Sequence, residues 1–288
     1  MQAELEAATG RRFRAGPQAL SSGGGFAACE RWDSDAGAAF VKIAPVARAD
    51  ALAAEADALR AIAAARALRV PAVIGIGTAG ARAFLVLDWI DFGSARRGTE
   101  AQLGEGLARL HQTGAAQFGW HRDNTIGATP QHNDWTADWI EFFARQRLGF
   151  QLDLAERSGH GGLWLERGRR LCEQFGEFFR GYRPQPSLLH GDLWGGNWAA
   201  DAAGAPVIFD PASYYGDREA DLAMTQLFGG FGRAFYDAYE SAWPLDPGAG
   251  TRRDLYNLYH VLNHLNLFGG GYQSQAEAMI ERLLAAIR

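Results

Sequence analysis

The most informative sequence in this chain is Leu188-Leu189-His190-Gly191-Asp192-Leu193-Trp194-Gly195-Gly196-Asn197, followed by Val207-Ile208-Phe209-Asp210. It reads as an apolar strand, a short loop, a second strand, a glycine turn and a third strand. Three oxygen-bearing side chains stand at Asp192, Asn197 and Asp210. A plain hairpin with polar loop residues explains any one of them, but not all three at these spacings after an apolar strand.

The spacing H-x-D-x-x-x-x-N, followed by an acid at the end of a β-branched run, is the layout that phosphoryl transfer from ATP requires. One carboxylate, Asp192, receives the proton of the attacking hydroxyl. The amide oxygen of Asn197 and the carboxylate of Asp210 then hold Mg²⁺, which prefers hard oxygen ligands and keeps several waters. The stretch therefore predicts a kinase.

Composition sets the limits of this prediction. The 288 residues are more than one core usually holds, so we expect two lobes. A net charge of −5 argues against a nucleic-acid partner, which calls for a basic face. We expect no membrane span and no secretory signal, since no apolar run is long enough and the first residues are acidic. Two cysteines make no disulfide framework. A cytoplasmic monomer or weak dimer is the expectation.

Only one of the 28 Lys and Arg residues is a lysine, Lys42, in the apolar segment 38–43. Where arginine serves every other positive charge, a surviving lysine suggests a site that needs a compact ammonium group. Helical periodicity across 49–68 places Glu55 within the apolar stripe of Leu52, Leu59 and Ile62. A buried carboxylate needs a cation, so we expect a Lys42–Glu55 ion pair, with Lys42 also reaching the phosphates.

The N-terminal lobe is predicted over 1–92. Gly23, Gly24 and Gly25 form a turn before the segment 27–32 and can bring backbone N–H groups to phosphates, although no G-K-[ST] follows to make a P-loop. Strands are expected at 27–32, 38–43, 73–78 and 83–87. The segment Asp88-Trp89-Ile90 should then be the hinge between lobes, where backbone groups meet adenine.

The C-terminal lobe is predicted over 93–288 and is mostly helical, with helices at 99–113, 135–148, 163–181, 231–243, 252–268 and 274–287. A further helix opens after Tyr214, and Asp221 in it is expected to anchor the catalytic loop through backbone N–H groups. The string His121-Arg122-Asp123 imitates a kinase catalytic loop, but the residue five beyond Asp123 is Ala128. It is either a loop near the active cleft that contacts substrate or a turn held by Asp123 and Asn124.

The chain resembles the fructosamine kinase (ketosamine 3-kinase) family, within the aminoglycoside-phosphotransferase-like kinases. The motifs that carry the resemblance follow the family's order along nearly the whole chain: Gly23-Gly24-Gly25, Phe40-Val41-Lys42, Phe118-Gly119-Trp120-His121, Trp139-Ile140-Glu141-Phe142-Phe143, the catalytic loop 190–197, Asp210-Pro211-Ala212, the segment 214–224 and His264-Leu265-Asn266. One departure is Phe26-Ala27-Ala28-Cys29, where a more polar stretch is expected.

The resemblance implies an α+β, two-lobed protein-kinase-like fold, with a small β-rich N-lobe holding one main helix and a larger, mostly helical C-lobe. It implies ATP and Mg²⁺ as cofactors and a ketosamine or glycated protein as the acceptor, phosphorylated at its sugar 3-hydroxyl. The unstable product then breaks down and frees the amine. By resemblance, Asp192 is the base, Asn197 and Asp210 bind the metal, and Lys42 contacts the phosphates.

Two alternatives stay open from the residues alone. An aminoglycoside, choline-type or other small-molecule kinase shares Asp192, Asn197 and Asp210, so only the acceptor discriminates. A non-catalytic kinase-like binding protein is the other, and the intact set of Lys42 and Glu55 with the three loop residues counts against it.

Overall fold

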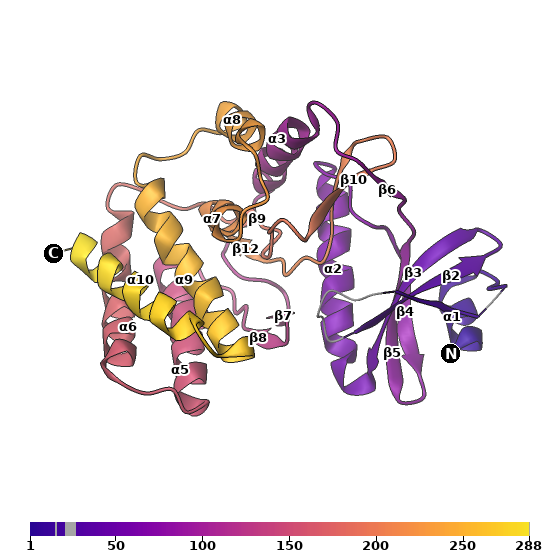
Figure 1. Ribbon diagram of the computed structural model, residues 1–288, viewed down its shortest axis with the longest axis horizontal. Helices are drawn as coiled ribbons and strands as arrows, with labels where there is room; N and C mark the ends of the chain where they lie inside the picture. The colour runs from indigo at the N-terminus through magenta and orange to yellow at the C-terminus, as the bar shows by residue number, and fades with distance from the viewer. Residues whose placement is uncertain (15, 21–26, 288) are drawn as a thin grey trace.

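The computed structural model describes residues 1–14, 16–20 and 27–287. It has two lobes joined by one continuous connection, with the strands of the N-lobe sheet on the right and the helices of the C-lobe on the left in Figure 1. The expected α+β, kinase-like organisation is confirmed. The segment Gly23–Gly25 lies outside the described residues.

In its described residues the N-lobe forms a five-stranded antiparallel sheet of order β1-β2-β3-β5-β4. Its elements are α1 (Gln2–Thr9), β1 (Gln18–Leu20), β2 (Ala28–Ser34), β3 (Gly37–Pro45), α2 (Ala49–Ala65), β4 (Val73–Ala79) and β5 (Arg82–Asp88). The short helix α1 contributes Leu5 to a small core with Val41, Phe84 and Val86 on one face of the sheet. The long helix α2 contributes Leu52 and Leu59 to the main core with Leu85 on the other face.

Strand alternation determines where Lys42 points. Successive side chains of a strand face opposite sides of the sheet. Val41 and Ile43 belong to the small core, whereas Ala44 belongs to the main core shared with α2. Lys42 therefore lies on the α2 side, as its ion pair with Glu55 requires.

The C-lobe carries seven further helices and four short strand pairings in the described residues. The helices are α3 (Thr99–His111), α4 (Trp139–Phe143), α5 (Phe150–Arg157), α6 (Leu163–Glu173), α7 (Glu219–Leu227), α8 (Arg233–Ala242), α9 (Ala249–Phe268) and α10 (Tyr272–Ala286). We count α4 and α5 as one bent helix, because the π-helical segment Ala144–Gly149 joins them. The strands are β6 (Phe92–Gly93), β7 (Asn124–Ile126), β8 (Thr129–Gln131), β9 (Ser187–Leu188), β10 (Trp198–Asp201), β11 (Pro206–Ile208) and β12 (Tyr215–Gly216). A turn of 3₁₀ helix follows α6 at Phe175–Phe179.

The prediction of one helix over 135–148 is wrong at both ends. Asp138 caps α4 by accepting the backbone N–H groups of Ile140 and Glu141, so the helix begins at Trp139. Beyond 148 the helix continues through its π-helical segment into α5, which the sequence analysis did not predict. The predicted helix over 163–181 is likewise shorter, because α6 ends at Glu173 and only 3₁₀ turns follow.

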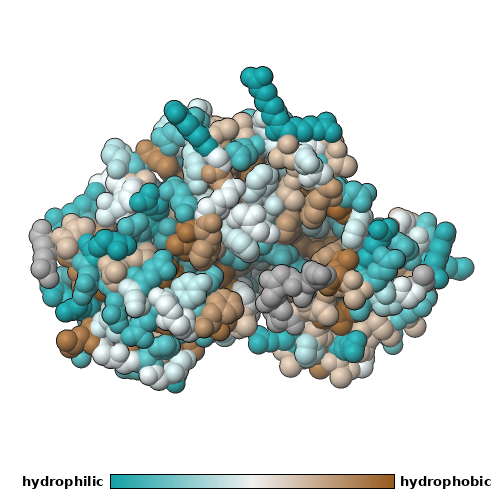
Figure 2. Space-filling view, viewed as in Figure 1, coloured by the Kyte–Doolittle hydropathy of each residue, from teal (hydrophilic) through white to brown (hydrophobic). Residues whose placement is uncertain are grey.

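The junction of the lobes is visible in the surface as well as the ribbon. Strand β6, directly after the predicted hinge, pairs with β10 of the catalytic hairpin, with Phe92 opposite Asp201. In Figure 2 the molecule narrows between the lobes, and hydrophobic side chains appear on both sides of the narrowing. No helix in the described ranges is long and apolar enough to cross a membrane.

Candidate active site

Lys42 joins both lobes at the centre of the site. Its ammonium Nζ lies 2.7 Å from a carboxylate oxygen of Glu55 on α2 and 2.7 Å from one of Asp210, 168 residues further along the chain. Only 10% of the Lys42 side chain and 12% of the Glu55 side chain are exposed, against 51% for Asp210. The expected Lys42–Glu55 pair is thus formed, and Lys42 also contacts the predicted metal ligand.

For both Lys42 and Glu55, burial and the charge of the ion-pair partner shift the pKa in opposite directions. Burial alone lowers the pKa of Lys42, but the two carboxylates outweigh it and hold that pKa above its usual value. Burial raises the pKa of Glu55, and the charge of Lys42 opposes that change. Lys42 therefore stays a cation at neutral pH, in a place where phosphate oxygens can replace the Asp210 contact.

The catalytic loop runs from β9 to β10 and turns at Gly191. This glycine has φ +85°, and a Cβ there would lie 2.1 Å from the carbonyl oxygen of Ala212. Only glycine permits this close approach of the two backbones. The loop is held further by the N–H of Ala212, which donates to the carbonyl of His190 at 2.9 Å.

Asp192 and Asn197 meet within this loop. The Asn197 Nδ2 donates to the Asp192 backbone carbonyl at 2.8 Å and to its carboxylate at 3.2 Å, which orients the Asn197 amide oxygen away from Asp192. Burial, with a further contribution from the charge of Asp210, raises the pKa of Asp192 to about 7. A carboxylate with this pKa is well matched to accept a proton near neutral pH.

Asp210 follows β11 in an unusual backbone conformation. Its φ is +57°, and Arg66 is the one other non-glycine residue in the described chain with positive φ. Such a conformation persists only where the surroundings impose it. This conformation leaves the Asp210 carboxylate half exposed beside Lys42. The same hairpin supplies the side-chain oxygen of Asn197, whose Nδ2 group donates to Asp192. One carboxylate and one amide oxygen are a donor set suited to Mg²⁺.

Nowhere in the described residues do three or more His, Cys, Asp or Glu side chains gather in a way that could hold a metal ion. Softer metals prefer such nitrogen- and sulfur-rich groups, whereas Mg²⁺ does not need them.

Asp221 at the start of α7 anchors the loop as predicted. Its carboxylate accepts the backbone N–H groups of His190 at 2.7 Å and Gly191 at 2.8 Å, and it lies 3.0 Å from Nε2 of His111. Burial alone raises the pKa of Asp221, but these hydrogen bonds and the His111 contact hold it below its usual value. His111 at the end of α3 is a partner that the sequence did not reveal.

The predicted hinge residues Asp88, Trp89 and Ile90 lie where β5 leaves the N-lobe sheet. Asp88 is the last residue of β5, and its carboxylate accepts the backbone N–H of Ala72. The Trp89 indole donates to Asp91 at 2.8 Å and lies under the guanidinium of Arg31, 4.8 Å from the ring centre. These contacts lie within the N-lobe, and the chain meets the C-lobe at the next residue, Asp91, whose carbonyl accepts the backbone N–H of Ala202 at 2.9 Å. That the segment takes adenine stays a prediction.

Cys29 stands opposite Lys42 across β2 and β3. Burial raises the pKa of its thiol, and the charge of Lys42 opposes that change without reversing it. The thiol is therefore protonated at neutral pH and lacks the thiolate character of a reactive cysteine. It fits the interpretation of a small residue in a strand.

The string at 121–123 has a role that the sequence analysis missed. Arg122 donates to Asp57 of α2 at 2.7 Å, and the His121 ring lies 3.4 Å from the same carboxylate. Asp123 accepts the backbone N–H of Asn133 at 2.9 Å, so it closes the loop 121–133 across its two ends rather than holding a local turn. Sequence reasoning could not find the Arg122–Asp57 bridge, because it joins residues 65 positions apart.

The same loop is tied to the segment that follows Asp210. Asn124 donates to the carbonyl of Ser213 at 2.9 Å, and Gln131 donates to that of Ala212 at 3.1 Å. Arg147, fully buried, donates to Asn133 at 2.6 Å and lies against the Tyr214 ring. The loop 121–133 therefore contacts both the helix that carries Glu55 and the chain that carries Asp210.

Comparison with known proteins identifies relatives by sequence along nearly the whole chain. Residues 1–286 match the family model described as fructosamine kinase. A probable ketoamine kinase of Synechocystis is 49% identical over 246 residues, 85% of this chain and 82% of the relative. A chloroplastic protein-ribulosamine 3-kinase of Oryza sativa is 43% identical over 272 residues, 92% of this chain and 78% of the relative.

Solved structures agree with the sequence relatives. A crystal structure of a fructosamine-3-kinase candidate from Thermobifida fusca has a TM-score of 0.88 at 28% identity, covering 99% of this chain and 98% of that one. An aminoglycoside phosphotransferase crystallised with ADP and hygromycin B has a TM-score of 0.66 at 15% identity, covering 100% and 98%. The second similarity concerns the fold alone.

Proposed function

Because this chain belongs to the fructosamine kinase family, we propose that it transfers the γ-phosphoryl group of ATP to the sugar 3-hydroxyl of a ketosamine. The observation that carries the proposal is the convergence of Lys42, Glu55 and Asp210 through two contacts of 2.7 Å, beside the paired Asp192 and Asn197. The buried Asp192 held by Asn197 beside this cluster counts against a binding protein without catalysis.

The transfer is a direct displacement. The acceptor's 3-hydroxyl oxygen forms a bond to the γ-phosphorus while the bond from that phosphorus to the β,γ-bridging oxygen breaks, and ADP leaves. The hydroxyl proton passes to the Asp192 carboxylate, whose pKa burial and Asp210 raise to about 7. No phosphoenzyme is required, because positioning and charge stabilisation supply the catalysis.

The N-lobe residues bind and orient the nucleotide. Lys42 contacts the α- and β-phosphates in place of its Asp210 contact, and Glu55 keeps the ammonium in position. Asn197 and Asp210 hold Mg²⁺, which when bound neutralises charge on the phosphates. The backbone of Asp88–Ile90 takes the adenine.

The acceptor is a ribulosamine or fructosamine on an amine or a protein. Phosphorylation at O3 makes the adduct unstable, so that it decomposes and frees the amine. A glycated lysine is thereby returned to unmodified lysine. The names of the relatives support this substrate class, since they include a ketoamine kinase and a protein-ribulosamine 3-kinase.

A panel of acceptors tests the proposal. ADP release in the presence of Mg²⁺ should occur with ribulosamines, erythrulosamines or fructoselysine, and phosphorus NMR of the product should place the phosphate on O3. Asp192→Asn should lower kcat by at least about 100-fold, and ADP binding should be retained. Phosphorylation of an aminoglycoside or choline but of no ketosamine, or full activity of Asp192→Asn, would overturn it.

A further inference from the structure

A chain of hydrogen bonds leads from Asp221 away from the catalytic loop into α3 and α8. His111, whose side chain is fully buried at the end of α3, has Nε2 3.0 Å from the Asp221 carboxylate and Nδ1 2.8 Å from the Tyr239 hydroxyl. Arg218, directly before α7, donates to the same hydroxyl at 3.3 Å. We name Arg218, Tyr239, His111 and Asp221 the anchoring chain, because it ends at the carboxylate that holds the loop.

Only one placement of protons gives each polar group of the anchoring chain a partner. A guanidinium offers donors alone, and an ionised carboxylate offers acceptors alone. The Arg218 N–H therefore donates to the Tyr239 oxygen, and the hydroxyl proton is left for Nδ1 of His111. At the other end, Asp221 accepts from Nε2. A doubly protonated His111 would leave the Tyr239 O–H without an acceptor in the anchoring chain. From these partners we assign the neutral His111 tautomer that carries its proton on Nε2.

The Tyr239 hydroxyl keeps its proton at neutral pH. Burial raises the pKa of Tyr239, and the positive charge of Arg218 opposes that change without reversing it. Because Tyr239 is 1% exposed, bulk water has little access to compete for its hydrogen bonds. The hydroxyl is therefore a lasting donor to the His111 ring.

The packing of α8 on α3 fixes the hydroxyl in this position. A Cβ on Gly104 of α3 would lie 2.1 Å from the carbonyl oxygen of Phe235 in α8, so the two helices touch backbone to backbone. They lie side by side in Figure 1, and Tyr239 follows Phe235 by about one helical turn. Just past the end of α8, the carbonyl of Trp243 accepts from the Arg218 guanidinium at 2.7 Å, and the Trp243 ring centre lies 4.1 Å from it. Both neighbours of the Tyr239 hydroxyl are thus held in place.

The Tyr239 hydroxyl matters because a neutral histidine has two tautomers. Without a donor at Nδ1, the ring can carry its proton there and turn the lone pair of Nε2 toward the Asp221 carboxylate. Two acceptors then face each other across 3.0 Å, which displaces the carboxylate. Asp221 holds the backbone N–H groups of His190 and Gly191, the two residues before Asp192. The wrong tautomer is therefore expected to shift the loop that carries Asp192.

We propose that Tyr239 is a positioning residue for phosphoryl transfer: its hydroxyl selects the His111 tautomer that donates to Asp221, and it thereby holds the catalytic loop in place. This inference rests on the proposed function, because only there is Asp192 the base. Tyr239 acts through two intervening side chains. Its loss should slow the transfer and leave the Lys42–Glu55 pair intact.

Tyr239→Phe tests the proposal, because it keeps the ring and removes only the hydroxyl. With ribulosylated Nα-acetyl-lysine amide as the acceptor, we expect kcat to fall about 10-fold and KM for ATP to stay within about twofold. Nitrogen NMR of the His111 ring should show the proton on Nε2 in the unaltered protein and a mixture of tautomers in the variant. The amide protons of His190 and Gly191 should exchange faster in Tyr239→Phe.

Tyr236→Phe is the matched control. Tyr236 is on the same helix, and its hydroxyl lies 3.1 Å from that of Thr225 in α7, outside the anchoring chain. This variant also loses one hydroxyl contact between α8 and α7, but kcat, the His111 tautomer and the amide exchange should stay unchanged.

Two variants of His111 give a second measurement. The amide of His111→Gln can accept from Tyr239 and donate to Asp221, whereas His111→Leu can do neither. We expect His111→Gln to keep at least about fivefold more activity than His111→Leu.

Several results would overturn the inference. They are a His111 proton on Nδ1 in the unaltered protein, a kcat of Tyr239→Phe within about twofold of the unaltered value, an equal loss in Tyr236→Phe, and equal activity of the two His111 variants. An unaltered enzyme that releases no ADP with any ketosamine overturns the proposed function instead. The NMR and exchange measurements do not depend on turnover, so they still decide whether Tyr239 holds the loop.

Discussion

Asp221→Asn tests whether one buried carboxylate sets the geometry of the catalytic loop. Asp221 is 2% exposed and receives two backbone N–H groups, from His190 at 2.7 Å and Gly191 at 2.8 Å, besides the His111 ring. An asparagine offers one acceptor oxygen and places an NH₂ group where the second carboxylate oxygen was. At least one of the two loop N–H groups then faces a donor instead of an acceptor.

The size of the effect follows from that lost acceptor. A buried donor left without a partner costs roughly 1–3 kcal/mol, with more for bonds to a charged acceptor. The side chain can orient its oxygen toward His190 and His111, so only the Gly191 bond is lost. We expect Asp221→Asn to lower the free energy of unfolding by about 2 kcal/mol and Asp221→Ala by about 4 kcal/mol.

The activity should fall further than this stability loss implies. Displacing the loop by about 1 Å moves Asp192 relative to the acceptor hydroxyl, and such misplacement costs on the order of 100-fold in rate. The Lys42–Glu55 pair makes no contact with Asp221, so KM for ATP should change by less than about threefold. Urea unfolding and steady-state kinetics at saturating ATP measure the two effects separately.

The pH dependence has a definite sign. Burial favours the neutral acid, but the hydrogen bonds prevail and hold the pKa of Asp221 below its usual value, so its contribution to stability is full above that value. The stability difference between the unaltered protein and Asp221→Asn should be constant from about pH 6 to 8 and shrink below about pH 4, as the carboxylate takes up a proton.

Met224→Ala supplies the control for this experiment. Met224 is also in α7 and is 2% exposed, and its truncation should cost about 2–4 kcal/mol through the cavity it leaves. Because its side chain is apolar and holds no loop N–H group, kcat at a temperature well below the transition should be preserved. The reasoning is refuted if Asp221→Asn loses stability while kcat stays within about threefold, or if Met224→Ala loses as much activity.

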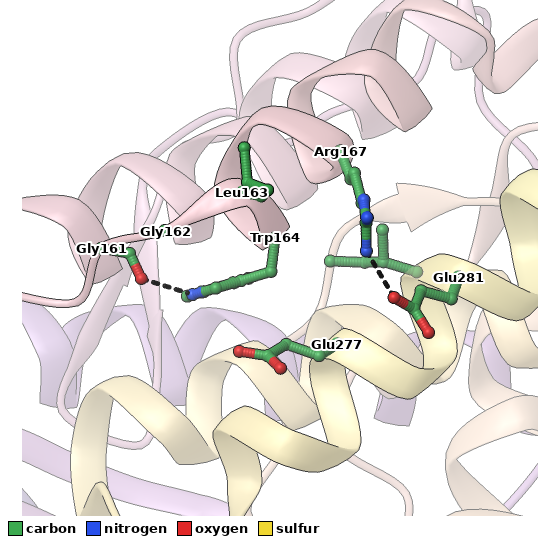
Figure 3. A pocket seen from close by; sticks show the side chains of 8 residues that line it. Gly161, Gly162, Leu163, Trp164, Arg167, Glu277 and Glu281 are labelled. Atoms are coloured by element: carbon green, nitrogen blue, oxygen red, sulfur yellow. Dashed lines mark hydrogen bonds and ion pairs between the residues drawn. The ribbon is translucent and has the colours of Figure 1, made fainter.

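Three further substitutions have defined outcomes. Arg122→Gln removes the 2.7 Å contact with Asp57 and should raise the dissociation constant for ADP several-fold in calorimetry, while Arg167→Gln, which breaks the ion pair with Glu281 drawn in Figure 3, should not. Gly191→Ala places a Cβ 2.1 Å from a backbone oxygen, so thermal unfolding should show a loss of at least about 3 kcal/mol; a variant as stable as the unaltered protein would contradict the backbone geometry. Burial lowers the pKa of His260 to about 3, so the unaltered protein loses stability as pH falls below about 6.5; His260→Gln should reduce that slope by about 1.4 kcal/mol per pH unit near pH 5, and an unchanged slope would refute it.

Local chemistry made the Lys42–Glu55 pair predictable from sequence. A single lysine in an apolar strand and a carboxylate within a helical apolar stripe each lack a partner, and burying either one alone is costly. That complementary need indicates the pair without knowledge of the fold. The Lys42–Asp210 contact could not be found in this way, because Asp210 is half exposed and satisfied by water as easily as by a cation.

The bent helix from α4 to α5 shows why element boundaries were harder to predict. Aromatic residues at 135, 139, 142 and 143 suggest one helix from Trp135, but Asp138 caps the backbone and the chain before it pairs with Phe118. The π-helical segment admits Gly149 without ending the helix, although glycine usually signals an end. Neither feature follows from hydrophobic period: the cap is a local hydrogen bond from Asp138, and Thr136 before it pairs with Phe118.

The loop 121–133 carries this dependence into the active site. Its Arg122 fixes Asp57 on the helix that carries Glu55, and its Asn124 and Gln131 fix the carbonyls just after Asp210. Lys42 contacts the carboxylates of Glu55 and Asp210. The loop 121–133 lies outside the catalytic motifs and therefore restrains the two segments that carry these partners of Lys42. A shift of the loop is therefore expected to move Lys42, the proposed phosphate contact, together with the hairpin that carries Asp210. We therefore expect coupling between the proposed acceptor and nucleotide sites to depend on the Arg122–Asp57 contact.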